Sequence, residues 1–82
     1  MSNSHTLRLN GAAHEIHAGA TLLELIVAFT GHPLRSDGSR VDGGRLGVAA
    51  AVGGIVVPRG RWAVYTVDDS DEIEIVTAVQ GG

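Results

Sequence analysis

Residues 21–31, TLLELIVAFTG, contain the start, the apolar face and the end of one short helix. Thr21 and Glu24 have the spacing of a capping box, in which the threonine caps the first turn and the glutamate reaches back to it. Apolar side chains then recur at helical spacing, at Leu22, Leu25, Ile26 and Phe29. Gly31 follows where a left-handed C-cap is expected, and a proline two residues later prevents the helix from resuming. We therefore predict a helix over residues 22–30 whose apolar stripe is core.

Two short strands joined by a tight turn are predicted before this helix. Residues 6–9, TLRL, alternate polar and apolar side chains, which places both leucines on the buried face of a strand. Asn10 and Gly11 form a turn dipeptide that tolerates positive φ at both positions. The chain then returns over residues 13–16, and the two strands form a hairpin.

A second hairpin and a final strand are predicted after the helix. Residues 48–52, VAAAV, are apolar throughout, which indicates a strand buried on both faces or nearly so. The glycines at 53 and 54 turn the chain, residues 55–57 return, and Pro58 ends the strand because it lacks an N–H donor. The last strand covers residues 72–79, with alternate side chains on its two faces.

The remaining segments connect these elements. Residues 32–46 form a long polar loop, and loops of this length tend to be functional or mobile. Residues 59–63 form a connecting segment. The resulting order of elements is typical of an α+β layer arrangement, the β-grasp (ubiquitin-like) fold, with a mixed sheet of four to five strands packed on one helix. We predict that residues 1–82 form a single such domain with a flexible C-terminal tail over residues 79–82.

Composition excludes several classes of function. The chain has 82 residues, a net charge of −3 and no cysteine, so disulfides, thiolate metal sites and a cysteine nucleophile are excluded. Its six basic residues are all arginine and form no basic stripe, which argues against nucleic acid as a partner. No apolar run approaches the ~20 residues of a membrane span, and the N-terminus lacks the features of a secretory signal. We expect a cytoplasmic protein with no membrane partner.

The C-terminal residues are the most informative ones for function. Gln80, Gly81 and Gly82 follow directly after the last predicted strand. A glycine pair has no side chains and wide φ/ψ freedom, so it can thread a narrow channel and present its carboxylate to the active site of another protein. The alternative interpretation is a frayed chain end.

Several segments along the chain match those of a known family. They are Leu9-Asn10-Gly11, Gly19-Ala20-Thr21-Leu22, Val57-Pro58-Arg59, Trp62, Asp71-Glu72-Ile73-Glu74-Ile75-Val76 and Thr77-Ala78-Val79-Gln80-Gly81-Gly82. In these segments the chain resembles the ThiS family, the sulfur carriers of thiamine biosynthesis. The resemblance covers most of residues 6–82, apart from the loop at 32–46, which is longer than the family pattern. The turn at residues 53–54 also departs from it, because the family often has Asn-Gly there.

The resemblance implies a carrier that is acted on by enzymes and is not itself an enzyme. A ubiquitin-activating-like adenylyltransferase would use Mg-ATP to adenylate Gly82, and a sulfur donor such as a cysteine desulfurase would lead to a thiocarboxylate. Thiazole synthase would then take up the sulfur. Gly82 would carry the sulfur, Gly81 would let the backbone pass a constriction, and Gln80 and Val79 would contact the partner. The chain itself would hold no cofactor and no catalytic residue.

Other functions stay open from the residues alone. They are a sulfur carrier for molybdopterin or cysteine synthesis, a ubiquitin-like modifier joined to lysines of other proteins, and an inert β-grasp binding module. The C-terminal sequence argues against the molybdopterin pathway.

Further residues allow two interpretations each. Arg59 and Arg61 beside Trp62 are a candidate contact patch for the adenylating enzyme, or a solvated loop in which the tryptophan partly covers the core. His14 and His17 face opposite sides of a strand, so no metal site is predicted. The acidic residues at 68–74 either dock on a basic surface or form a solvated turn and strand face.

Overall fold

The computed structural model describes residues 3–77, and the predicted elements are all present in it. They are β1 (Ser4–Leu9), β2 (Ala12–His17), α1 (Leu22–Thr30), β3 (Val48–Val52), β4 (Ile55–Val57), η1 (Arg59–Val64) and β5 (Glu72–Thr77). The segment predicted as a plain connection over residues 59–63 forms the 3₁₀-helix η1. The predicted end of the last strand and the tail at residues 78–82 lie outside the described residues.

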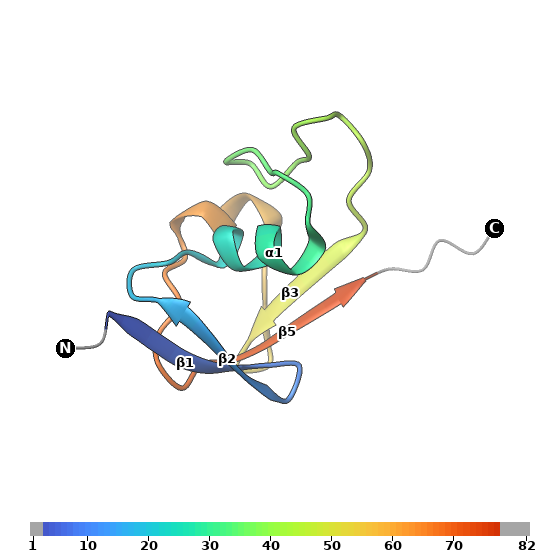
Figure 1. Ribbon diagram of the computed structural model, residues 1–82. Coiled ribbons are helices and arrows are strands. Elements are labelled where there is room, and N and C mark those ends of the chain that lie inside the picture. The colour runs from blue at the N-terminus through green and yellow to red at the C-terminus, as the bar shows by residue number, and fades with distance from the viewer. Residues whose placement is uncertain (1–2, 78–82) are drawn as a thin grey trace.

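Over residues 3–77 the strands form one mixed sheet in the order β2-β1-β5-β3-β4, with α1 packed across one face (Figure 1). β1 and β5 are parallel, with Arg8 opposite Glu72 and Leu9 opposite Ile73. The other neighbouring strands are antiparallel. This arrangement confirms the predicted β-grasp fold, and it places β5 in the middle of the sheet.

The ends of α1 are formed by the residues that the sequence indicates. Thr21 Oγ1 accepts a hydrogen bond from the Glu24 N–H at 3.3 Å, and the Thr21 N–H donates to Glu24 Oε2 at 2.7 Å. Gly31 has a φ of 75° and donates its N–H to Val27 O at 2.8 Å. Local sequence therefore sets both ends of this helix.

The core lies between α1, η1 and the inner face of the sheet. Its buried side chains are Leu7, Ala20, Leu22, Leu25, Ile26, Leu46, Ala50, Val57, Trp62, Val67, Ile73 and Ile75. Trp62 is only 1% exposed, so it is a central core residue and not the partial cover that the sequence suggested. Its indole N–H donates to Val57 O at 3.0 Å, which satisfies the one polar atom that a buried tryptophan carries.

Two further burial predictions are wrong. Phe29 was predicted to be core, but its side chain is 42% exposed because it lies in the last turn of α1 and lines a groove beside Val48 and Thr77. The strand at residues 48–52 was predicted to be buried on both faces or nearly so, but Ala49 is exposed and only Ala50 is fully buried. Within residues 3–77 a single α-helix covers the sheet, and it can cover only one face.

The loop over residues 32–46 is irregular, as predicted, but one β-bridge joins it internally and two contacts anchor it to the rest of the fold. Leu34 and Arg40 form an isolated β-bridge, and Leu46 joins the core. Gly38 is buried with a φ of +86°, and a Cβ there would lie 2.1 Å from Arg59 Cγ. The loop is therefore packed against η1 at this glycine.

We expect Thr21→Ala to lower the free energy of unfolding by about 1 kcal/mol, because the helix loses its side-chain cap. Chemical denaturation of the variant and the parent chain measures this difference. Thr21→Ser retains the hydroxyl and is the control, with an expected loss of less than half as much. Equal stability of Thr21→Ala and the parent chain would contradict the role of the capping box.

Candidate functional site

The candidate site begins where β5 ends, at Thr77. Thr77 is paired with Val48 of β3, and Gly82 is the fifth residue after it in the sequence. The four tail residues predicted to function, Val79, Gln80, Gly81 and Gly82, lie outside the described residues, so their roles stay predictions. The surfaces around Thr77 are those that a protein holding the tail would meet first.

The side chain of Asn10 holds β5 in place near this end. The backbone ladder between β1 and β5 stops with the hydrogen bond from Asn10 N to Ile73 O, at 2.9 Å. The Asn10 amide then continues it: its Oδ1 accepts from the Ile75 N–H at 2.9 Å, and its Nδ2 donates to Ile75 O at 3.2 Å. Asn10 adopts a φ of 52° and Gly11 a φ of 84°, as predicted for the turn. The Asn10 side chain thus makes the two hydrogen bonds to Ile75 that the backbone of a further β1 residue would otherwise make.

A groove runs along β5 beyond this contact. It has a volume of about 720 Å³, and its lining includes Arg8, Gly11, Glu74 and Thr77. Successive residues of a strand direct their N–H and C=O groups to alternate sides, and those of Ile73 and Ile75 point toward β1. The backbone groups of Thr77 therefore point into the groove. They lie on the side of β5 that β1 does not reach, because β1 ends at the turn of Asn10 and Gly11.

The outer face of the sheet, opposite α1, carries an apolar surface beside Thr77. We call this surface the outer patch; it consists of Ala49, Ala51, Val56 and Val76. The two valines are 67% and 60% exposed, and with Glu74 the patch surrounds a shallow hollow of about 130 Å³. Exposed apolar patches of this kind mark protein-binding sites.

Sequence reasoning missed the outer patch, although the sequence contained a signal for it. Residues 48–52 are apolar at every position, and the predicted fold had only one helix to cover the sheet. An apolar strand under such a fold must expose alternate side chains on the uncovered face. The exposed Ala49 and the half-buried Ala51 are those alternate residues.

Arg59 and Arg61, the predicted partner contacts, have different surroundings. The Arg59 guanidinium donates to Leu46 O and Val48 O, and its Cζ lies 5.3 Å from the centroid of the Trp62 ring. It thus joins the long loop to the core. Arg61 is exposed on η1. Contact of either residue with a partner stays a prediction, and the occupied guanidinium of Arg59 makes Arg61 the more available one.

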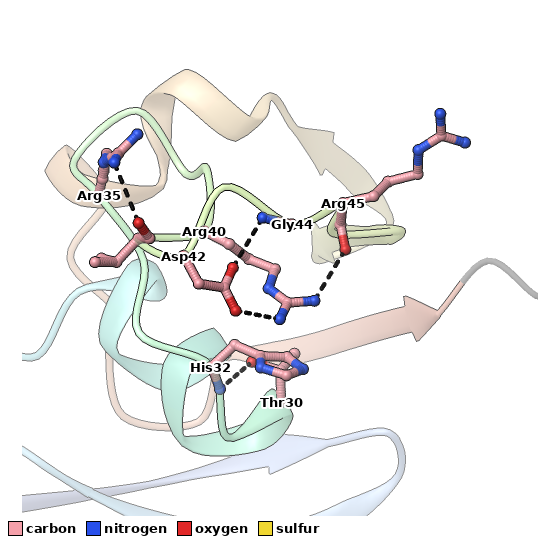
Figure 2. Close-up of polar contacts among 8 residues, drawn as sticks. Thr30, His32, Arg35, Arg40, Asp42, Gly44 and Arg45 are labelled. Atoms are coloured by element: carbon pink, nitrogen blue, oxygen red, sulfur yellow. Dashed lines mark hydrogen bonds and ion pairs between the residues drawn. The ribbon is translucent and has the colours of Figure 1, made fainter.

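The long loop gathers charged side chains above the C-terminal end of α1 (Figure 2). Arg40 donates to the Asp42 carboxylate through Nη2 and to Arg45 O through Nη1, the latter at 3.3 Å. The Gly44 N–H donates to Asp42 Oδ1 at 2.8 Å. These hydrogen bonds, that from Arg40 first, hold the pKa of the Asp42 carboxyl below its usual value of 3.8. Asp42 is therefore a carboxylate at neutral pH and keeps Arg40 in place.

The acidic residues before β5 serve the turn that precedes it. Asp69 Oδ1 accepts from the Thr6 N–H at 2.8 Å, and Asp71 Oδ2 accepts from the Asp68 N–H at 2.8 Å. Glu72 and Glu74 are exposed on β5. The turn interpretation of this acidic run therefore accounts for Asp69 and Asp71.

Histidines were weighed as metal ligands in the sequence. His14 is half-buried and His17 is exposed on β2, and His17 Nε2 lies 3.6 Å from Glu24 Oε1. Between Asn3 and Thr77, the structure brings no three histidine or acidic side chains together in a metal-ligating arrangement. The same residues contain no helix long and apolar enough to cross a membrane.

Comparison with known proteins identifies the family. A model of the ThiS family matches residues 7–82, which is nearly the whole chain. The chain belongs to the ThiS family. It is accordingly a small sulfur carrier protein of thiamine biosynthesis.

A solved structure shares the fold of this ThiS-family chain. It is the crystal structure of the thiamine biosynthesis protein ThiS from Geobacter metallireducens, with 24% sequence identity and a TM-score of 0.61. The match covers 94% of this chain and 99% of the other. No curated protein sequence matches the chain.

We expect Asn10→Gly to speed hydrogen exchange of the Ile75 amide and to lower the free energy of unfolding by about 1–2 kcal/mol, because two hydrogen bonds to Ile75 are lost. Glycine is the suitable replacement because it tolerates the positive φ of position 10. Exchange followed by nuclear magnetic resonance gives the protection of each amide. Asn10→Asp is the matched control, since its carboxylate still accepts from the Ile75 N–H. If Ile75 is equally protected in Asn10→Gly, the side chain does not hold β5.

Proposed function

We propose that this chain carries sulfur as a thiocarboxylate on Gly82. A ubiquitin-activating-like adenylyltransferase adenylates the terminal carboxylate with Mg-ATP, and a donor such as a cysteine desulfurase supplies the sulfur. Thiazole synthase then receives it for the thiazole ring of thiamine. The family match, which runs through Gly82, is the observation that carries this proposal.

The chemistry explains why a terminal carboxylate needs a partner enzyme. A carboxylate is a poor electrophile, so its oxygen first attacks the α-phosphorus of ATP and pyrophosphate leaves. The resulting acyl-adenylate is a mixed anhydride. A persulfide sulfur attacks its carbonyl carbon, AMP leaves, and an acyl disulfide forms. A thiol then reduces the S–S bond and leaves the thiocarboxylate. Its sulfur anion is the stronger nucleophile at neutral pH, for the same reason that thiolates are reactive.

The energetics of the tail favour docking by the folded body. Fixing the backbone of one residue costs roughly 1–2 kcal/mol, so ordering the five residues after Thr77 costs about 5–10 kcal/mol. Two glycines have no side chains with which to offset this cost. Contacts of the folded body must supply the difference, and we assign this role to the outer patch, which lies beside Thr77 and is apolar and exposed.

The roles of the tail residues follow from this arrangement. Gly81 lets the backbone pass a narrow channel because it has no β-carbon, while Gln80 and Val79 contact the channel entrance. The protein itself binds no cofactor in the cycle, since the Mg-ATP belongs to the adenylating enzyme. We place the cycle in the cytoplasm, where ATP and persulfide donors are available.

Intact mass spectrometry tests the proposed modification. With the adenylyltransferase, Mg-ATP, a sulfur donor and a thiol, we expect a mass increase equal to the exchange of one oxygen for one sulfur, located at Gly82. A variant with one alanine appended after Gly82 is the control and should remain unmodified with an unchanged melting temperature. An unmodified parent chain in the complete system would refute the proposal, and adducts on lysines of other proteins would show a modifier instead.

We expect Val76→Asp to raise the KM of the adenylyltransferase for this protein about tenfold or more, because a charge replaces a central apolar contact of the outer patch. Pyrophosphate exchange at varied carrier concentration measures KM and kcat separately. Val64→Asp is the matched control, since Val64 is 71% exposed but lies on η1, on the helix side of the sheet. Equal KM values for the two variants would remove the outer patch from the interface.

A further inference from the structure

We infer that the groove between the end of α1 and the long loop binds an acidic segment of the protein that holds the tail. This inference rests on the proposed function, because it needs a partner seated at Thr77. The groove has a volume of about 380 Å³. Its walls are Phe29, Thr30, His32, Arg40, Arg45, Leu46, Gly47, Val48 and Thr77.

The floor of the groove is held rigidly. Thr30 Oγ1 donates to Ile26 O at 2.8 Å and accepts from the His32 N–H at 3.2 Å, which fixes the turn that leaves α1. On the other side, Arg40 is held by Asp42 and by the carbonyl of Arg45 (Figure 2). The loop thus offers a formed surface, and a ligand needs little ordering of the protein to use it.

The groove carries positive charge on a protein that is negative overall. Among the described residues, the groove lining contains two arginines, Arg40 and Arg45, and no carboxylate, although the whole chain has a net charge of −3. Asp42, which pairs with Arg40, is not part of the lining. The Arg45 guanidinium has no partner among residues 3–77, and the buried Arg40 Nε has no acceptor there. An acidic ligand would supply the missing partner of the exposed Arg45 guanidinium.

The arrangement of the charges favours an extended segment over a single small anion. Figure 2 shows the guanidinium of Arg45 extending away from that of Arg40, so the two groups do not converge on one point. The apolar ring of Phe29, 42% exposed, adds a contact that suits a side chain and not a free anion. Carboxylates spaced along a peptide, with an apolar residue between them, match this pattern.

The position of the groove identifies the kind of protein that would bring such a segment. Thr77 lines the groove and is also the residue from which the tail continues. A protein that binds the tail would therefore lie next to Thr77, close to both the outer patch and the long loop. The groove and the outer patch lie on opposite faces of the sheet, so a partner using both would hold the start of the tail from two sides.

A peptide titration tests the groove without the partner. A blocked peptide that alternates aspartate and leucine is added to the full chain, and backbone amide signals are followed. We expect saturable shifts at Phe29, Arg45 and Thr77 with a dissociation constant of about 1 mM or tighter. Arg45→Glu should weaken binding about fivefold or more. No saturable shift at these residues would overturn the inference.

Arg35→Glu is the matched control, because Arg35 lies in the same loop, is exposed and does not line the groove. It changes the net charge equally and loses one hydrogen bond, to Val41 O. Peptide affinity should stay within about twofold of the parent chain. An equal loss in both variants would show a general charge effect and overturn the inference. So would altered amide signals at residues 79–82 in Arg45→Glu without peptide, which would assign the groove to the chain's own tail.

The partner assay separates this inference from the proposed function. In pyrophosphate exchange with the adenylyltransferase, Arg45→Glu should raise KM about fivefold with kcat unchanged, and Arg35→Glu should change neither. Normal modification of Gly82 together with an unchanged KM for Arg45→Glu would overturn the groove and leave the carrier function standing. An unmodified parent chain would instead refute the carrier function, whatever the peptide titration shows.

Discussion

The position of β5 between β1 and β3 is the constraint on which the rest of the structure depends. Its parallel ladder to β1 is short, with two register pairs, and the antiparallel ladder to β3 has five. The side chain of Asn10 adds the next pair of hydrogen bonds on the short side, at Ile75. This contact joins residues that are 65 positions apart in the sequence, and it fixes the direction in which the chain leaves the sheet.

A helix that covers one face of a sheet leaves the other face exposed to solvent or to a binding partner. In the part of the chain that the structure describes, α1 and η1 both lie on the inner face. The outer face of β3 and β4, together with Val76 of β5, carries alanine and valine, and charged residues occur beside them only on β5, at Glu72 and Glu74. The apolar outer patch therefore lies next to Thr77, after which the proposed tail begins.

The features that were predicted correctly are those that depend on interactions between neighbouring residues in the sequence. The capping box at Thr21, the left-handed Gly31 and the turn at Asn10 depend on near neighbours, and each was predicted at the right residue. Phe29 and Trp62 were misjudged because their burial depends on the extent of the sheet and on η1, which are set by distant residues. The bond from Asn10 to Ile75 was also invisible in the sequence, since a turn dipeptide gives no sign of what its side chain contacts. The role of the tail stays a prediction from the C-terminal residues and the family resemblance, whereas the outer patch and the loop groove required the assembled sheet.

The middle place of β5 also affects how the protein is made. β5 is translated after every other described element, yet it separates β1 and β3 in the finished sheet. Until it emerges from the ribosome, the chain consists of two hairpins and a helix that lack their shared neighbour, and isolated hairpins are at best marginally stable in water. Assembly of the complete sheet must therefore wait until β5 has been synthesised.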